Sequence, residues 1–212
     1  MRTEKKVYAI ACMLFVLLTA TVSAQDKKED NSGTNPVNFT YDFRMWMEVE
    51  SMAGDNSFTK TTFEYRAPLS KTVATRFRGY KIDVSLGSGA SAATTTGFGD
   101  MDARVIWVPR VSQRGAIALG MEATFNTASQ EILGTGKTTL GPQAFLVFFQ
   151  PFGIKGSILA PAYQYVFDIA GDDDRADISR SAIDIFFVWL AANKKHWVTV
   201  NPTVIIDHEN EK

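Results

Sequence analysis

Cysteine and histidine are almost absent from this sequence, which has one Cys and two His among 212 residues. Cys12 lies in an apolar run near the start of the chain, too early in that run for a lipid-attachment site. Without it no thiol remains, which excludes disulfides, zinc–cysteine sites and cysteine nucleophiles. Neither His196 nor His208 has a nearby serine or acidic partner arranged as a nucleophilic triad requires. We therefore expect no catalytic residues, no metal, no cofactor and no enzymatic activity.

Long hydrophobic runs are missing beyond the N-terminus. Three basic residues precede the apolar residues 7–20, and small residues at 22–24 offer a cleavage site, so residues 1–24 are predicted to be a secretory signal peptide. The apolar run is shorter than the roughly 18 residues that a spanning helix needs. After it, purely apolar runs are short, such as 145–149. The sequence therefore predicts no transmembrane helix, and any membrane crossing would be made by strands.

An excess of positive charge is also lacking. Residues 1–24 hold three of the 22 basic and one of the 23 acidic residues, so the remainder carries 19 against 22. Nucleic acid is therefore not an expected partner, because phosphate binding needs a basic surface. Residues 25–36 are polar and charged and are predicted to be a disordered leader before one domain, residues 37–212.

A period of two dominates residues 39–50. Every odd position is apolar, whereas the even positions are mostly polar or charged. Successive side chains of a strand point to opposite faces, so this stretch predicts a strand with one apolar and one polar face. Its twelve residues are close to the roughly 9–11 that a tilted strand needs to cross a bilayer with its polar face toward a lumen.

Strand-like segments recur along the rest of the chain without any helical pattern. We expect nine strands, at 39–50, 57–67, 72–86, 100–109, 115–126, 138–150, 154–168, 178–190 and 196–206. Their connections alternate between short turns and longer loops, of which the longer ones span 87–99, 127–137 and 170–177. Short periplasmic turns alternating with long external loops are typical of an all-β, antiparallel up-and-down transmembrane β-barrel.

The alternation also predicts which side chains face which way. The odd residues Phe43, Met45, Leu119, Phe125, Ile185 and Phe187 are expected to face lipid. The even residues are expected to line the lumen: Arg44, Trp46, Glu48, Glu64, Arg66, Arg76, Arg78, Asp102, Arg104, Glu122, Arg180 and Asp184. In a narrow barrel these opposite charges would pair across the interior. They would either line a conducting pore or form a salt-bridged filling with no through-path, and the sequence leaves both open.

An acidic segment lies in the last long loop. Asp172, Asp173, Asp174 and Asp177 provide carboxylate oxygens, the ligands that calcium prefers, but without the spacing of a calcium-binding loop. We expect a solvated external loop.

Three loop motifs carry a resemblance to a known family. The sequence reads Gly-Phe-Gly-Asp at 97–100, Leu-Gly-Thr-Gly-Lys at 133–137 before Leu-Gly-Pro at 140–142, and Ala-Gly-Asp-Asp-Asp-Arg at 170–175. In order and spacing over roughly residues 36–206, the chain resembles the outer-membrane barrels named for the MetA pathway of phenol degradation. The resemblance implies an outer-membrane protein of a Gram-negative bacterium, of a family often labelled transporters and sometimes encoded near genes for degrading aromatic compounds. It implies no catalytic residues.

These observations predict a porin-like passive channel for small molecules, hydrophobic or aromatic ones included, with outer-membrane lipid and a small solute as partners. The alternative is a structural or ligand-binding barrel with a closed lumen. Nine strands do not close an antiparallel barrel, so further strands are expected after residue 212, in a barrel of about twelve. The first and last strands are then expected to lie near each other with a gap or a forced pairing between them.

Overall fold

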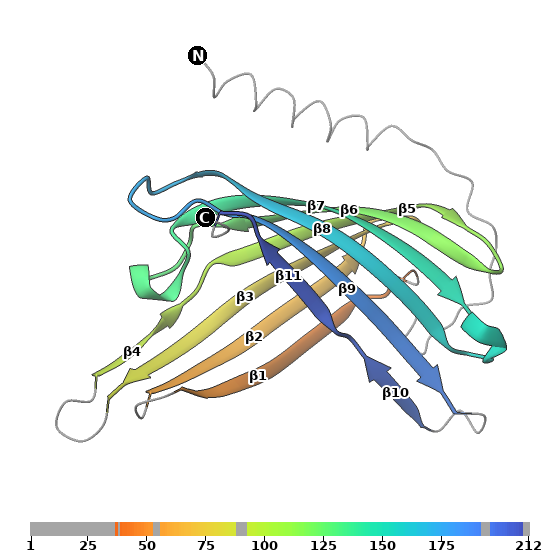
Figure 1. The fold of residues 1–212 in the computed structure, drawn as a ribbon, viewed down its shortest axis with the longest axis horizontal. Helices are drawn as coiled ribbons and strands as arrows, with labels where there is room; N and C mark the ends of the chain where they lie inside the picture. Colours follow the sequence, from red (N-terminus) through yellow and green to blue (C-terminus); the bar gives the residue numbers. More distant parts are fainter. Residues whose placement is uncertain (1–36, 38, 53–55, 88–92, 192–195, 210–212) are drawn as a thin grey trace, which may run out of the picture.

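The computed structural model describes residues 37, 39–52, 56–87, 93–191 and 196–209. Within these residues a single antiparallel sheet contains eleven strand segments (Figure 1). They are β1 (Asp42–Met52), β2 (Asn56–Pro68), β3 (Val73–Leu86), β4 (Ala93–Phe98), β5 (Met101–Val111), β6 (Gly115–Phe125), β7 (Lys137–Phe149), β8 (Ile158–Gly171), β9 (Ser179–Leu190), β10 (Trp197–Val200) and β11 (Thr203–Asp207). Two short 3-10 helices, η2 (Glu131–Leu133) and η3 (Pro151–Gly153), lie in connections. The predicted all-β antiparallel fold is confirmed.

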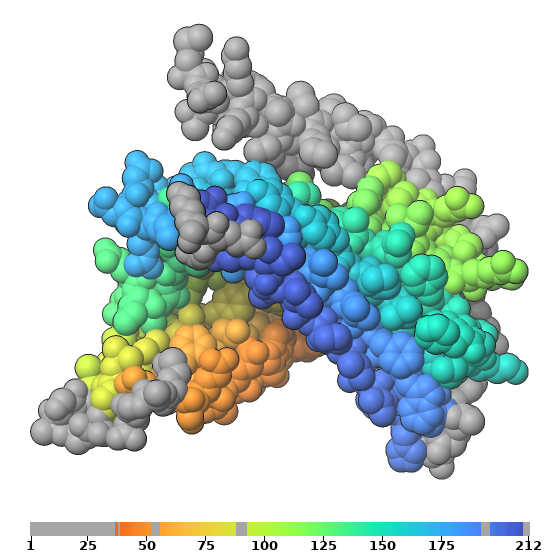
Figure 2. Space-filling view, in the orientation of Figure 1, coloured from red at the N-terminus to blue at the C-terminus, as the bar shows by residue number. Residues whose placement is uncertain are grey.

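The sheet curls into an open half-barrel. Its strands follow one another in chain order from β1 to β10, with β4 added on β3 and β11 on β9 (Figure 1). No ladder joins β1 to β10 or β11 among the described residues, and Figure 2 shows the β1 side (orange) and the β10–β11 side (blue) standing apart. The two edges are thus separated by a gap, as the sequence predicts for the first and last strands.

The period of two in the sequence becomes two distinct faces of the sheet. Phe43 lies opposite Tyr65, and Tyr65 lies opposite Phe77, so apolar residues of β1, β2 and β3 share the convex face. Leu119 lies opposite Trp107 on the same face of β5 and β6. Of the six odd residues predicted to face outward, five are exposed, and Phe187 is half-buried.

Strand β7 reverses the odd and even pattern. Ala144 lies opposite Leu119, so the outward residues of β7 carry even numbers. Leu146 and Phe148 are accordingly exposed, whereas Val147 is buried on the concave face. Both faces of β7 are apolar near its C-terminal end, which explains why its sequence alternates poorly.

Four predicted boundaries are wrong. The seventh strand spans Ile158–Gly171 (β8) and not 154–168. The first strand begins at Asp42, where pairing with Arg66 starts, and not at Phe39. The predicted loop 87–99 contains β4, which pairs with β3 from Lys81 to Leu86. The last strand is split into β10 and β11 at Pro202, because proline lacks the backbone N–H that a continuous ladder needs. The predicted signal peptide and leader lie outside the described residues.

The interior is packed most densely at the short-turn end of the half-barrel. Seven buried apolar residues cluster there on the concave face: Val108, Ala116, Ala118, Val147, Ile158, Ala160 and Val188. Phe39 packs against this cluster from the segment before β1, together with Phe145, Phe149 and Phe186. The half-barrel is therefore filled by side chains at one end, while its middle carries the charged residues. No helix of the described chain has the length and apolar character to span a bilayer.

Candidate functional site

The concave face collects the residues that the sequence predicts to be inward. Cross-strand pairing places Arg44 opposite Glu64 and Glu64 opposite Arg78, and Arg78 lies opposite Asp102. A second row runs from Arg66 through Arg76 and Arg104 to Glu122. Arg180 and Asp184 lie on β9, on the other side of the half-barrel.

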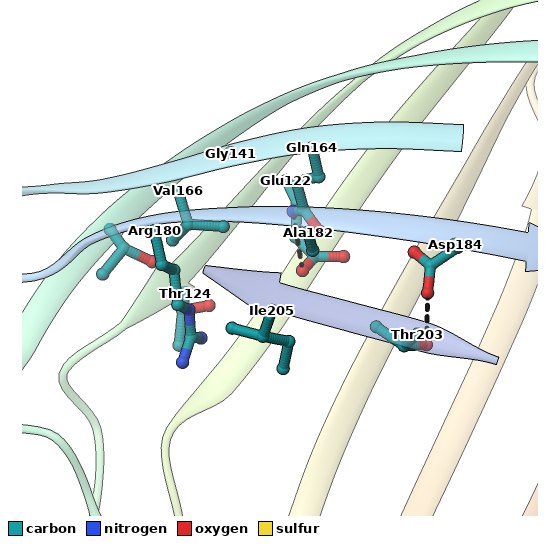
Figure 3. A pocket seen from close by; sticks show the side chains of 11 residues that line it. Glu122, Thr124, Gly141, Gln164, Val166, Arg180, Ala182, Asp184, Thr203 and Ile205 are labelled. Atoms are coloured by element: carbon teal, nitrogen blue, oxygen red, sulfur yellow. Dashed lines mark hydrogen bonds between the residues drawn. The ribbon is translucent and has the colours of Figure 1, made fainter. Parts of the chain in front are cut away.

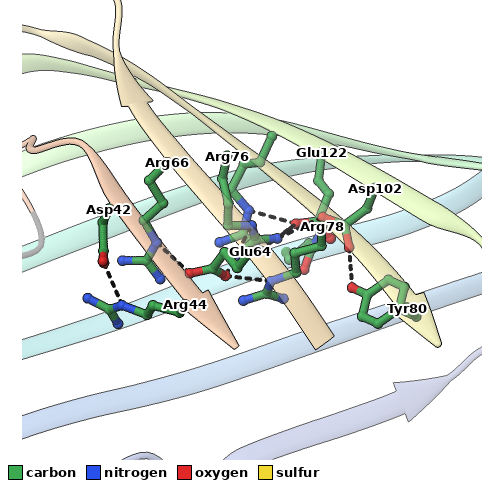
Figure 4. Close-up of polar contacts among 11 residues, drawn as sticks. Asp42, Arg44, Glu64, Arg66, Arg76, Arg78, Tyr80, Asp102 and Glu122 are labelled. Carbon is green, nitrogen blue, oxygen red and sulfur yellow. Dashed lines mark hydrogen bonds and ion pairs between the residues drawn. The ribbon is translucent and has the colours of Figure 1, made fainter. Parts of the chain in front are cut away.

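Seven of these residues form one ion-paired network, which we call the charge ladder (Figure 4). Its members are Glu64, Arg66, Arg76, Arg78, Asp102, Arg104 and Glu122. Glu64 is only 1% exposed and accepts hydrogen bonds from Nε of Arg66 and Nε of Arg78, both at 2.6 Å. Four arginines and three carboxylates give the ladder a formal charge of +1.

Arg76 is the central cation of the ladder. It is buried on β3, and its Nη2 donates to Asp102 Oδ1 at 3.1 Å and also to Glu122 Oε2. Arg104 Nε donates to the same Glu122 oxygen at 2.7 Å. Three strands, β3, β5 and β6, are thereby joined by side chains as well as by their backbones.

The prediction that opposite charges pair across the interior is wrong. Every ladder contact stays within one wall, from β2 to β6. Most contacts join residues on the same or neighbouring strands, and Arg76 on β3 reaches past β5 to Glu122 on β6. Cross-strand neighbours on one face lie about 4.5–5.5 Å apart at Cβ, which is within reach of these side chains, whereas the opposite wall is not. The charges are therefore paired within this wall, although Arg76 Nε, 3.9 Å from Glu64 Oε2, has no hydrogen-bond partner among the described residues.

Two uncharged polar residues also contact this network, and a search of the sequence for charged residues alone misses them. Tyr80 donates its hydroxyl hydrogen to Asp102 Oδ2, and Gln164 Nε2 donates to Glu122 Oε1 at 3.4 Å. Tyr80 is the next even-numbered residue of β3 after Arg78. The alternation in the sequence could therefore have placed Tyr80 among the predicted concave residues.

The remaining predicted residues on the first strands lie at the edge of the ladder. Arg44 pairs with Asp42 on its own strand, and Glu48 pairs with Lys60 at 2.9 Å. The Trp46 ring lies 5.6 Å from the Arg78 guanidinium, a cation–π distance. β1 thus contributes an aromatic surface beside the charges.

A cavity of about 240 Å³ opens on the concave face of β6 to β9 and β11 (Figure 3). Arg180 and Asp184 lie at its two sides, with Ala182 between them on β9. Asp184 accepts a hydrogen bond from Thr203 at 2.5 Å. Arg180 is exposed and, within the described chain, takes part in no ion pair. The cavity therefore has a free cation on one side and apolar Val166 and Ile205 on its walls.

Asp100 organises the long-loop end of the sheet. Its carboxylate accepts hydrogen bonds from the backbone N–H groups of Thr127 and Ala128 at 3.0 Å each, and of Thr135 at 2.7 Å. The Thr135 hydroxyl donates to the same group at 3.0 Å. A single buried carboxylate at the start of β5 therefore holds both ends of the β6–β7 loop.

The glycines before Asp100 let this loop approach β4. A Cβ on Gly97 would lie 2.2 Å from Ser129 Oγ and 2.7 Å from Leu133 Cδ1. A Cβ on Gly99 would lie 2.6 Å from Ile82 Cδ1. Larger residues at either position would push the loop away from the sheet, which gives the Gly-Phe-Gly-Asp motif a structural role.

The acidic loop after β8 joins the same assembly. Arg175 donates from Nη2 to the carbonyl oxygens of Glu131 at 2.9 Å and Gly134 at 2.7 Å. Lys137 Nζ donates to Asp177 at 2.9 Å, and this hydrogen bond at the loop end of β7 raises the pKa of Lys137. All three motifs that carry the family resemblance therefore meet at one end of the sheet.

The Asp172 carboxylate acts within its own loop. Asp172 Oδ1 accepts the backbone N–H of Asp174 at 2.9 Å, and the side chain of Asp173 is exposed. Among the residues that the structure describes, no group of three or more His, Cys, Asp or Glu side chains is placed to hold a metal ion.

One histidine does have a serine partner, contrary to the prediction. His208 Nε2 lies 2.9 Å from Ser181 Oγ, which is also 2.9 Å from the Tyr163 hydroxyl. Ser181 and His208 come from neighbouring strands, so their spacing in the sequence gives no hint of the contact. Over residues 37–209, as far as described, no acidic side chain hydrogen-bonds the His208 ring, so the third group of a triad is not supplied.

No protein-family model matches this chain, and no curated protein matches it. The resemblance to the MetA-pathway barrels stays a prediction from the loop motifs.

Proposed function

We propose that this chain is exported by its signal peptide to the outer membrane of a Gram-negative bacterium. There it forms the wall of a β-barrel that acts as a passive channel or transporter for small molecules, including hydrophobic or aromatic ones. The observation that carries the proposal is the separation of faces: large apolar side chains are exposed across the convex face, while the charged residues pair on the concave face. A soluble sheet would bury the apolar face instead.

The distribution of aromatic residues supports a bilayer around the convex face. Trp107, Trp189 and Trp197 all lie near the short-turn ends of β5, β9 and β10, and Tyr65 lies near the corresponding end of β2. Tryptophan and tyrosine are enriched where a barrel meets the membrane–water interface. This end would then sit at one surface of the membrane.

The concave face suits a hydrated passage. Because the ladder satisfies its charges within one wall, the middle of the half-barrel needs no filling group. Trp46 and Ile205 add apolar surface beside Arg78 and Arg180, respectively, so the lining offers contacts to solutes with an apolar part. The proposal also requires that the edges of β1 and β11 be paired in the membrane, because unpaired backbone groups in lipid cost several kcal/mol each.

A closed-lumen barrel is the second candidate, and the apolar cluster at the short-turn end favours it. Phe39, Phe145, Phe149 and Phe186 pack there on the concave face and narrow that end. Such a barrel would act as a structural or ligand-binding protein without transport.

Conductance in a planar bilayer distinguishes the two candidates. The channel proposal predicts stepwise, voltage-independent currents from the purified full chain in potassium chloride. Silence under all salt and voltage conditions, with the protein folded and inserted, would favour the closed barrel.

Ion preference tests whether the concave face lines the path. Arg180 is exposed in the cavity and makes no ion pair with any residue that the structure describes. Arg180→Glu should therefore shift the reversal potential toward cation preference, because charged residues in a pore set selectivity. Arg114→Glu, the same charge change in the exposed β5–β6 turn, is the control and should have a smaller effect. An unchanged reversal potential for Arg180→Glu, with currents retained, would remove this residue from the path.

A further inference from the structure

The β6–β7 loop, residues 126–136, lies over the concave face instead of extending away from the sheet. Leu133 is only 4% exposed and packs against Ile82 and Val84. These two residues have even numbers, like Arg76 and Arg78 on β3, so their side chains point to the same concave face. Ile132, the preceding residue, is 55% exposed. The loop therefore inserts one apolar side chain into the half-barrel above the charge ladder.

This loop is fixed to the sheet on both of its sides. On the β4–β5 side, Asp100 accepts three backbone hydrogen bonds from Thr127, Ala128 and Thr135. On the β8–β9 side, Arg175 donates to the carbonyl oxygens of Glu131 and Gly134. β6 and β7 lie between these two attachment points, so the loop spans several strands at the long-loop end.

We propose that residues 126–136 form a constriction that sets the upper size of solute admitted at the long-loop end, with Leu133 as the apolar anchor that holds the loop against Ile82 and Val84. This inference rests on the proposed channel function and adds the element that determines specificity. Asp100 and Arg175 are positioning residues: neither is proposed to touch the solute, and both hold the loop in place. Solutes that fit past a loop fixed in this way are small.

Thiol labelling tests the position of the loop independently of transport. With Cys12 replaced by serine, Leu133→Cys and Ile132→Cys each carry the only thiol of the full chain reconstituted in liposomes. A water-soluble maleimide should modify Ile132→Cys rapidly and Leu133→Cys at least about tenfold more slowly, because buried sites react only through local opening. Adding Asp100→Asn should accelerate labelling at 133 and leave 132 unchanged. Equal rates at 132 and 133 in the parent protein would overturn the inference.

Liposome swelling with sugars of increasing size then tests the effect on passage. Asp100→Asn and, where that variant inserts poorly, the exposed-loop variant Arg175→Gln should admit larger sugars than the parent does. An unchanged size limit in a variant whose residue 133 labels rapidly would overturn the constriction and leave the channel proposal standing. Absence of swelling for the parent and both variants, with the loop released, would overturn the channel proposal and the constriction with it.

Discussion

Ile183→Arg is expected to destabilise the inserted protein by about 2–4 kcal/mol, the cost of placing a cation on the lipid face of a barrel near the bilayer midplane. Ile183 is exposed on the convex face of β9, between Tyr163 of β8 and Val204 of β11. In water its exposure would make this substitution almost neutral. The free energy of unfolding from lipid vesicles, measured by denaturant titration, gives the cost directly.

Ala182→Arg is the matched control on the same strand. Ala182 lines the cavity on the concave face, where a new guanidinium would reach water, so the expected cost is well below that at 183. Equal costs at the two positions, or a larger one at 182, would contradict a lipid-facing convex surface. That outcome would favour a soluble sheet whose concave side is its core.

Arg76→Met is expected to destabilise the fold by about 3–5 kcal/mol, because removing one member of a buried ion network leaves its partners uncompensated. The Arg76 side chain is buried between Glu64, Asp102 and Glu122. Without it, Asp102 keeps the Tyr80 hydroxyl and Glu122 keeps Arg104, but the cation shared by both carboxylates is lost. Denaturant unfolding in vesicles or detergent measures this change.

Lys60→Met removes a cation from the exposed Glu48–Lys60 pair, for which a cost below about 1 kcal/mol is expected. Similar small costs for Lys60→Met and Arg76→Met would mean that water enters the ladder freely and screens it. The ladder would then contribute little to the stability of the wall.

The two faces of the sheet could be predicted because strand geometry alone fixes them. Side chains alternate in direction along any strand, so the side chains of Phe43 and Arg44 must point to opposite faces of the sheet, whatever the neighbouring strands are. The same rule placed Glu64 and Arg78 on one face. Which carboxylate each arginine meets depends on the register between strands, and that register is set by turn and loop lengths that local periodicity does not contain.

The predictions from sequence were wrong where segments that are distant in the sequence meet in the fold. Phe39 continues the alternation of β1, yet it precedes the first paired residue and packs on the concave cluster. After Gly79, apolar residues of β3 also lie on the concave face, because Ile82 and Val84 are covered there by Leu133, a residue about fifty positions later. No local sequence pattern in either segment predicts such a contact. Asp100 is a similar case, because its partners at 127, 128 and 135 lie across a loop.

A spin-label scan of β9 is the most direct test of the central claim, that the convex face meets lipid and the concave face meets water. One cysteine at a time is introduced along Ser179–Leu190 in a background without Cys12, and collision rates with oxygen and with a water-soluble nickel complex are measured in bilayers. Ile183 and Ile185 should favour oxygen, and Ala182 and Asp184 should favour the nickel complex, with a period of two. Nickel access on both faces, with no alternation, would contradict the account.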